Sequence, residues 1–108
     1  MECDLRTEGQ FTVVTLSGDV DLHYSPEARK QILEQLKANK NVLVDLSGVS
    51  YIDSSGIASL VEGFQLARNR KLQFGLVGVS EAAQQVLQLA RLDKIFQIKD
   101  SIGDFINQ

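Results

Sequence analysis

Residues 41–70 (NVLVDLSGVSYIDSSGIASLVEGFQLARNR) change their hydrophobic period partway along. Residues 42–46 form an almost continuous apolar run, the pattern of a strand that is buried on both faces of a parallel sheet. Apolar residues then recur at three- and four-residue steps, the spacing of one helix face: Ile57, Leu60, Val61, Phe64 and Ala67. The stretch therefore predicts a strand, a Ser/Gly-rich connection and a helix that begins at Asp53-Ser54-Ser55-Gly56.

Two hydroxyls and a carboxylate come together at this junction. The first turn of a helix has amide N–H groups without internal partners, so Asp53 or Ser54 is expected to cap it. Its partial positive charge is expected to stabilise a phosphate on a nearby hydroxyl. Gly56 omits a side chain, which is expected to let another protein approach the backbone closely. From these residues alone a plain helix cap and a modifiable serine both remain open, and the cap is the commoner use of Ser and Asp.

Composition limits the classes of function. The 108 residues fit one domain, 1–108, with 44% hydrophobic and 23% charged residues. A net charge of -3 without a Lys/Arg block argues against nucleic-acid binding. No apolar run approaches the roughly 20 residues that cross a bilayer, and the N-terminus lacks a signal-peptide pattern, so we expect a cytoplasmic location without membrane insertion.

The chain has one cysteine, Cys3, and one histidine, His23. One cysteine cannot form an internal disulfide, and one histidine leaves little for zinc chemistry, so no metal or cofactor is expected.

Strand and helix patterns alternate along the rest of the chain. A β-branched strand at 11–16 follows a weaker one at 3–6, close enough for a hairpin. Ser25-Pro26-Glu27 is a strong helix start, with the serine as the expected cap. Similar signals predict a strand at 72–77, a helix after Gly78-Val79-Ser80, a short strand at 95–98 and a closing helix from Ser101.

This order of elements determines the architecture. Strands that are joined through helices lie parallel, with right-handed crossovers, whereas an opening hairpin is antiparallel. The predicted fold class is therefore α/β: a small, mainly parallel β-sheet with an antiparallel edge strand, covered by about four helices.

Three readings that involve catalysis, nucleotides or metal are weak. A nucleophile elbow needs Gly-x-Ser-x-Gly, but Ser54 and Ser55 follow Ile-Asp. The glycine motifs of nucleotide-binding loops are absent from the sequence. Asp19, Asp21 and Asp53 each follow a strand and could gather Mg²⁺ as in a receiver domain, but the chain has too few βα units for that fold. The sequence therefore favours none of these three functions, and we do not expect an enzyme.

Four segments match one known family in order and spacing. They are Leu16-Ser-Gly-Asp-Val-Asp-Leu22, Val44-Asp-Leu-Ser-Gly-Val-Ser-Tyr-Ile-Asp-Ser-Ser-Gly-Ile57, Leu76-Val-Gly-Val-Ser80 and Leu89-Ala-Arg-Leu-Asp-Lys-Ile-Phe96. Together they resemble the STAS domain, and among its types the bacterial anti-sigma factor antagonist. The resemblance implies the STAS fold, a small sheet with helices packed against it, which agrees with the architecture predicted from the pattern.

The resemblance also implies a switch operated by phosphorylation. In the family the second serine of the Asp-Ser-Ser-Gly segment accepts the phosphate, which is Ser55 here. The donor is an anti-sigma factor that is also a serine protein kinase using ATP, and a serine phosphatase reverses the step. Unmodified antagonist binds the anti-sigma factor and modified antagonist releases it. The expected partner-binding residues are Asp21, Asp53, Ser54, Ser55, Gly56 and Ile57, although the periodicity of Ile57 favours the core.

A second function remains open within the same family. STAS domains also serve as stand-alone subunits of bacterial lipid-transport ABC systems. In that reading residues 53–56 would dock on an ATPase subunit, and phosphorylation would be incidental. A scaffold component of a sensory complex is a third reading.

Overall fold

The elements of residues 1–107, the part of the chain that this computed structural model describes, follow the order predicted from the sequence. They are β1 (Glu2–Glu8), β2 (Phe11–Val20), α1 (Ser25–Lys37), β3 (Asn41–Ile52), α2 (Ser54–Arg70), β4 (Phe74–Val77), α3 (Glu81–Leu89), β5 (Gln97–Lys99) and α4 (Ile102–Ile106). A hairpin is followed by three helix-containing connections and a closing helix.

The strands form one sheet in the order β1-β2-β3-β4-β5. β1 and β2 pair antiparallel through a turn in which Gly9 has a φ of 59°, a left-handed conformation that glycine adopts without strain. The pairs β2–β3, β3–β4 and β4–β5 are parallel, because each connection contains a helix. The predicted mainly parallel sheet with one antiparallel edge is confirmed.

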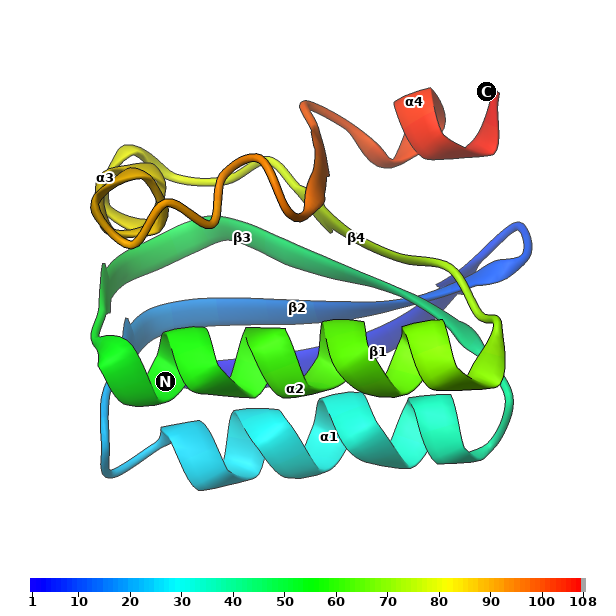
Figure 1. Cartoon of the computed structure of the whole chain (residues 1–108), viewed down its shortest axis with the longest axis horizontal. Coiled ribbons are helices and arrows are strands. Elements are labelled where there is room, and N and C mark those ends of the chain that lie inside the picture. Colours follow the sequence, from blue (N-terminus) through cyan, green and yellow to red (C-terminus); the bar gives the residue numbers. More distant parts are fainter. Residues whose placement is uncertain (108) are drawn as a thin grey trace.

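Both faces of the sheet bury apolar side chains. The main core lies between the sheet and α1, α2 and α3, and its sheet residues include Val14, Leu16, Val42, Val44, Leu46 and Leu76. A smaller core on the opposite face, closed by α4, consists of Phe11, Val13, Leu43, Val77 and Phe105. β3 therefore buries both faces, as its continuous apolar run predicted. Figure 1 shows α1 and α2 side by side along one face of the sheet and α4 beyond the other.

α1 and α2 run in the same direction and are closely packed (Figure 1). Near the N-terminal ends of the two helices, the hydroxyl of Ser59 donates to the main-chain oxygen of Ser25 (3.4 Å). Further along, a Cβ atom at Gly63 would lie 2.8 Å from the side chains of Ile32 and Phe74, so the helices approach closely only because this residue is glycine. Each helix follows its strand after a short connection, so both begin at the edge of the sheet where β2 and β3 end.

β2 and β3 are longer than the sequence predicts. The Ser/Gly content of residues 47–52 predicts a loop, yet these residues continue β3 to its end. They pair with the last residues of β2 across register shifts at Thr15/Ser17 and Gly18/Asp19, irregularities of the kind that bend and twist a strand. A Cβ atom at Gly48 would lie 3.0 Å from the Ser17 side chain, so this glycine serves the pairing and not a turn.

α1 begins without the predicted serine cap. The N-cap position is Tyr24, whose side chain makes no capping hydrogen bond, and Ser25 is buried against α2. Asp21 organises the turn instead. Its Oδ1 accepts from the amides of His23 (3.0 Å) and Tyr24 (3.1 Å), and its main-chain oxygen accepts from the amide of Ser25 (2.7 Å). An Asx-type turn therefore replaces the cap.

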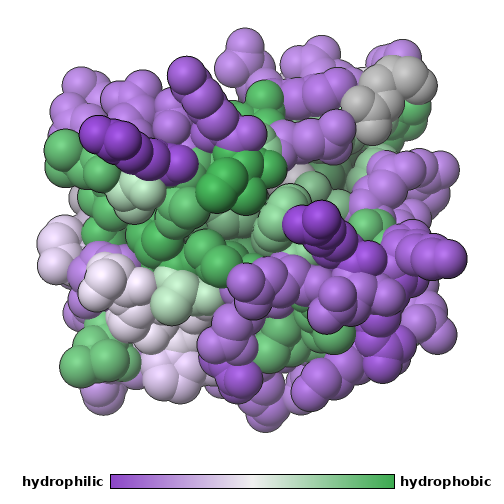
Figure 2. All heavy atoms as spheres, in the orientation of Figure 1, coloured by the Kyte–Doolittle hydropathy of each residue, from purple (hydrophilic) through white to green (hydrophobic). Residues whose placement is uncertain are grey.

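Hydrophilic side chains cover much of the face in Figure 2, with an apolar area across its upper half. The most exposed large apolar side chains of the described residues are those of Leu89 (86%) and Leu22 (74%). Within residues 1–107 no helix is both long and apolar enough to cross a bilayer.

Candidate functional site at the start of helix α2

Two of the acids singled out in the sequence meet at the edge where β2 and β3 end. Val20 and Ile52, the last residues of these parallel strands, are paired in register. The amide of Asp53 donates to the main-chain oxygen of Val20 (3.3 Å). Because the carboxyl ends of parallel strands share one edge of a sheet, the β2–α1 loop with Asp21 lies beside the β3–α2 junction. This edge is at the left of Figure 1.

Asp53 is the N-cap of α2 and the centre of the hydrogen bonds at this edge. Its Oδ1 accepts from the amides of Ser55 (2.9 Å) and Gly56 (3.3 Å) and from the hydroxyl of Ser55 (2.5 Å). Its Oδ2 accepts from the amide of Leu22 in the β2–α1 loop (3.1 Å). One carboxylate therefore caps the helix, orients the Ser55 hydroxyl and ties the two loops together. Of the two residues expected to cap, Asp53 makes the bonds and Ser54 does not.

These hydrogen bonds favour the ionised form of Asp53. The hydroxyl of Ser55 is the largest cause of a pKa below the usual aspartate value. Desolvation opposes this effect, and the amides of Gly56, Ser55 and Leu22 reinforce it. A fixed negative charge therefore lies directly against the hydroxyl of Ser55 at neutral pH.

The two serines of the junction differ in exposure. Ser54 is exposed at the first position of α2, and Ser55 is half-buried. Ser55 lines a hollow of about 230 Å³ between the first turns of the two parallel helices, which we call the α1–α2 groove. Its other lining residues are Ser25, Pro26, Arg29, Ala58, Ser59 and Glu62. Because Ser55 is half-buried and lines this hollow, its side chain opens to the surface through the groove.

Gly56 and Ile57 are buried. A Cβ atom at Gly56 would lie 2.6 Å from Cγ1 of Ile52 and 2.8 Å from the main-chain oxygen of Val20. The missing side chain therefore makes room for this chain's own residues, a reason for glycine that the expectation of partner approach did not include. Ile57 is 7% exposed and belongs to the main core, in agreement with its periodicity.

The β2–α1 loop and the end of β3 add exposed side chains beside the site, of which sequence reasoning missed Leu22 and Tyr51. The side chain of Leu22 is 74% exposed while its amide is held by Asp53. Tyr24 and Tyr51 are also exposed, and the Tyr24 ring meets His23 edge-on at 4.6 Å between centroids. A large apolar residue inside a polar loop was the available signal. These residues add exposed apolar area beside the site.

Asp19, Asp21 and Asp53 do not gather into a metal site. Asp19 accepts from the hydroxyl of Ser50 (3.1 Å), Asp21 binds its own loop, and Asp53 is occupied by helix and loop donors. In the described part of the chain no three His, Cys, Asp or Glu side chains could hold a metal ion. The receiver-type reading of these acids is therefore wrong.

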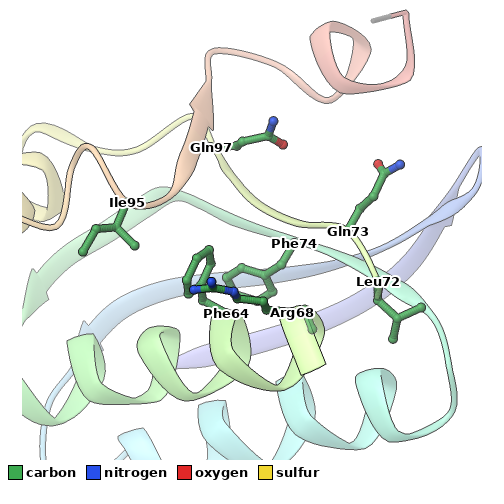
Figure 3. Close-up of a pocket in the computed structure, with 8 residues that line it drawn as sticks. Phe64, Arg68, Leu72, Gln73, Phe74, Ile95 and Gln97 are labelled. Atoms are coloured by element: carbon green, nitrogen blue, oxygen red, sulfur yellow. The ribbon is translucent and has the colours of Figure 1, made fainter. Parts of the chain in front are cut away.

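A second hollow, of about 250 Å³, lies toward the other end of α2 (Figure 3). Phe64 and Arg68 line it from α2, Phe74 from β4, and Ile95 from the segment before β5. Phe64 is nine residues beyond Ser55, about 13 Å along the helix axis. None of the residues expected to accept phosphate or bind a partner lines this hollow, so it is separate from the site.

Fold and site together define a class of protein: a small mixed α/β domain that displays a serine hydroxyl, held by a capping aspartate, at the start of its second helix. The family model of the STAS domain matches residues 2–105 of this chain. The chain therefore belongs to the STAS domain family.

The named relatives of this chain include two anti-sigma factor antagonists from different organisms. The chain is 27% identical over 92 residues to an anti-sigma-B factor antagonist of Listeria monocytogenes, an alignment that covers 84% of this chain and 81% of that protein. It is 25% identical over 103 residues to an anti-sigma F factor antagonist of Paenibacillus polymyxa, covering 94% of this chain and 88% of that protein. In both cases most of each chain is aligned.

Solved structures share the fold at lower identity. A putative anti-sigma factor antagonist from Thermotoga maritima superposes with a TM-score of 0.86 at 21% identity, covering 97% of this chain and 92% of that one. The Bacillus cell fate determinant SpoIIAA has been solved in two forms. The unphosphorylated form superposes with a TM-score of 0.81 and the phosphorylated form with 0.77, both at 17% identity over 98% of this chain, covering 94% and 97% of those chains.

Proposed function

We propose that this protein is an anti-sigma factor antagonist that acts as a binding module and not as an enzyme. Unmodified, it binds an anti-sigma factor that is also a serine protein kinase. Transfer of phosphate from ATP to Ser55 releases that partner, and a serine phosphatase restores the binding form. The observation that carries the proposal is the Ser55 hydroxyl, which opens to a surface groove and donates to Asp53 at the start of α2.

The comparisons support this proposal. Both curated relatives are named as anti-sigma factor antagonists, and both align with this chain over most of their length. SpoIIAA, which shares the fold, has been solved in a phosphorylated form. A domain of this fold therefore accepts a phosphate in at least one protein.

The proposed contact surface is the edge formed by the β2–α1 loop and the first turn of α2. Its polar residues are Asp21, Asp53, Ser54 and Ser55. The exposed side chain of Leu22 adds apolar area next to them. Gly56 and Ile57 lie beneath this surface, so their part is to hold the first turn of α2 in place and not to touch the partner.

Phosphorylation acts on this surface through charge. A phosphoserine carries about -1.5 to -2 charges at pH 7, and Asp53 already supplies a carboxylate beside it. A partner that fits the bare hydroxyl then meets unmatched negative charge. A like-charge contact across an interface costs several kcal/mol, which changes occupancy by a factor of about a hundred or more. Release therefore requires no refolding of the domain.

The test compares substitutions at Ser55 with one at its neighbour. Ser55→Ala, Ser55→Asp and Ser54→Ala are each mixed with the anti-sigma factor kinase of the same organism, with and without ATP. Calorimetry measures binding, and intact mass with site mapping follows the phosphate. We expect Ser55→Ala to bind in both conditions without gaining mass, and Ser55→Asp to bind at least about tenfold more weakly. Ser54→Ala is the matched control and is expected to gain phosphate and release the partner as wild type does.

Two results would remove the proposal. If Ser55→Asp binds the kinase as tightly as wild type, charge at this position does not cause release. If site mapping places the phosphate on another residue, Ser55 is not the switch.

The lipid-transport alternative leads to a different result. In that reading the same edge docks on an ATPase subunit, and neither substitution at Ser55 alters binding. The names of the two curated relatives favour the anti-sigma factor reading.

A further inference from the structure

The amides at the start of α2 are already engaged. Those of Ser55 and Gly56 donate to Oδ1 of Asp53, and that of Ile57 donates to the main-chain oxygen of Asp53 (3.0 Å). The sequence pattern predicts that this turn stabilises a phosphate. Because these amides already have acceptors, a phosphate on Ser55 needs another source of positive charge. An ester oxygen cannot donate, so phosphorylation also removes the bond from the Ser55 hydroxyl to Asp53. The two negative groups repel, and the phosphoryl group is driven away from Asp53.

The α1–α2 groove is the open side of Ser55, and Arg29 is the cation that lines it. Arg29 Nε donates to Oε2 of Glu62 (2.6 Å), which lines the same groove. The two side chains are 52% and 44% exposed, so both are free to move. Among the described residues, no oxygen accepts from the terminal Nη atoms of Arg29. The guanidinium therefore has vacant donors beside the modification site.

The geometry of the helices favours a contact between Arg29 and a group on Ser55. α1 and α2 are parallel (Figure 1), and long side chains of a helix lean toward its N-terminus. The common rotamers of Arg29 consequently aim its guanidinium toward the end of the groove where Ser55 lies. Arginine binds phosphate through two parallel N–H bonds, which are about twice as strong as neutral hydrogen bonds. A dianion also attracts the guanidinium more strongly than the single charge of Glu62 does.

Building on the proposed modification of Ser55, we infer that its phosphoryl group turns into the α1–α2 groove and is bound by the guanidinium of Arg29, which leaves Glu62. Glu62 then stands unpaired on the exposed side of α2. Phosphorylation therefore changes two surface groups: it adds a phosphate and uncovers a carboxylate. Only side chains move.

The test places phosphoserine at position 55 during translation, so that no kinase is needed. A ³¹P NMR titration then reports the second ionisation of the phosphate, which lies near pH 6 in ordinary phosphoserine. The charged side chains that line the groove or bind the Ser55 hydroxyl are Arg29, Glu62 and Asp53. Arg29→Gln is expected to raise the midpoint by about half a unit, because the lost cation favoured the dianion. Glu62→Gln is expected to lower the midpoint, because it frees Arg29 and removes a negative charge.

Lys30→Gln is the matched control. It removes the same charge from the next residue of α1, which is exposed and does not line the groove. We expect this variant to keep the wild-type midpoint. As a second measurement, the Nε–Hε signal of Arg29 in ¹H–¹⁵N spectra is expected to shift between the serine and phosphoserine forms, and to shift in the Lys30→Gln background as well.

Equal midpoints in wild type and Arg29→Gln would overturn the inference. An equal rise in Arg29→Gln and Lys30→Gln would overturn it too, because the effect would then be one of net charge. Neither result bears on whether the kinase modifies Ser55 or whether the partner is released. Failure of this inference is therefore distinguishable from failure of the proposed function.

Discussion

At the scale of single residues, the carboxylate of Asp53 has two roles: it stabilises the first turn of α2 and it orients the hydroxyl of Ser55. The same Oδ1 that caps the helix amides accepts the hydroxyl of Ser55. This bond fixes the direction of the hydroxyl and leaves its oxygen with acceptor capacity toward the groove. The carboxylate that caps α2 therefore also sets the surface that unmodified Ser55 presents to a partner.

The charge of Asp53 makes stability depend on pH. Its folded-state pKa lies below the ordinary value of 3.8, mainly because of the Ser55 hydroxyl. A lowered pKa means that the stabilisation is present above pH 3.8 and is lost as the pH falls through the folded-state pKa. Asparagine also caps helices well, so Asp53→Asn keeps one oxygen for the amides of α2 while it removes the charge and the acceptor for the amide of Leu22. Urea unfolding is expected to show the variant less stable at pH 7 and equal to wild type in strong acid. A gap that persists unchanged below pH 3 would contradict this prediction.

Gly56→Ala separates an internal role of this glycine from a role in partner approach. The added methyl group would press on the main-chain oxygen of Val20 and the side chain of Ile52. Overpacking of this kind costs about 1 to 3 kcal/mol in the free energy of unfolding. Gly103→Ala in α4 is the control, since its nearest neighbouring atom is 3.7 Å away, and we expect a change within about 0.5 kcal/mol. Wild-type stability of Gly56→Ala with weakened partner binding would restore the partner explanation.

The sequence predicts some of these residue roles and not others. Asp-Ser-Ser-Gly before a helical period predicts a cap, and Asp53 provides it. The hydrogen bond from Leu22 to Asp53 spans 31 positions, so no local pattern indicates it. The lack of space for a side chain at position 56 likewise depends on Val20, which lies in another strand, β2. Roles that depend on contacts between distant segments require the fold.

At the scale of secondary structure elements, α3 repeats the design of α2 with a different cap. The hydroxyl of Ser80 accepts from the amide of Ala83 (3.2 Å) and donates to the main-chain oxygen of Val49 in β3 (2.7 Å). Ser80→Ala therefore removes both a cap and a link to the sheet. We expect it to lower the free energy of unfolding by about 1 to 2 kcal/mol in urea titrations. Ser54→Ala is the control, because Ser54 is exposed and Asp53 makes the capping bonds of α2. Equal losses in the two variants would contradict this assignment.

Helices were easier to predict than strand ends. α2 and α3 begin where the sequence places them, because capping residues and a three-to-four-residue period occur together. The ends of β2 and β3 were missed, because serine and glycine are common in turns. Here they pair across two register shifts instead. β4 and β5 are short and begin two residues later than their apolar runs predicted.

At the scale of the whole molecule, the proposed switch lies outside the parts that hold the fold together. Ser55 is half-buried and lines the α1–α2 groove, whereas the central strand β3 is buried between the two apolar cores. The sequence predicted this architecture, because helical connections force parallel pairing. It did not indicate the α1–α2 groove, which joins Arg29 and Glu62 across 33 positions. A groove between two helices depends on how they pack and not on either helix alone.

This separation predicts that phosphorylation leaves the scaffold intact. A phosphate on Ser55 replaces one hydrogen bond at an edge, and the side chains expected to respond, Arg29 and Glu62, are half exposed. In ¹H–¹⁵N spectra of the phosphoserine form we expect shifts in the β2–α1 loop and the first turns of α1 and α2. Hydrogen exchange of Val44 and Leu76, both fully buried in the sheet, is expected to keep its protection.

Loss of exchange protection in β3 and β4 would mean that the phosphate acts by loosening the sheet. Release of a partner would then follow from a change in the fold. Protection that is kept, together with shifts limited to the edge, leaves charge at the surface as the cause, because the scaffold beneath it has not moved.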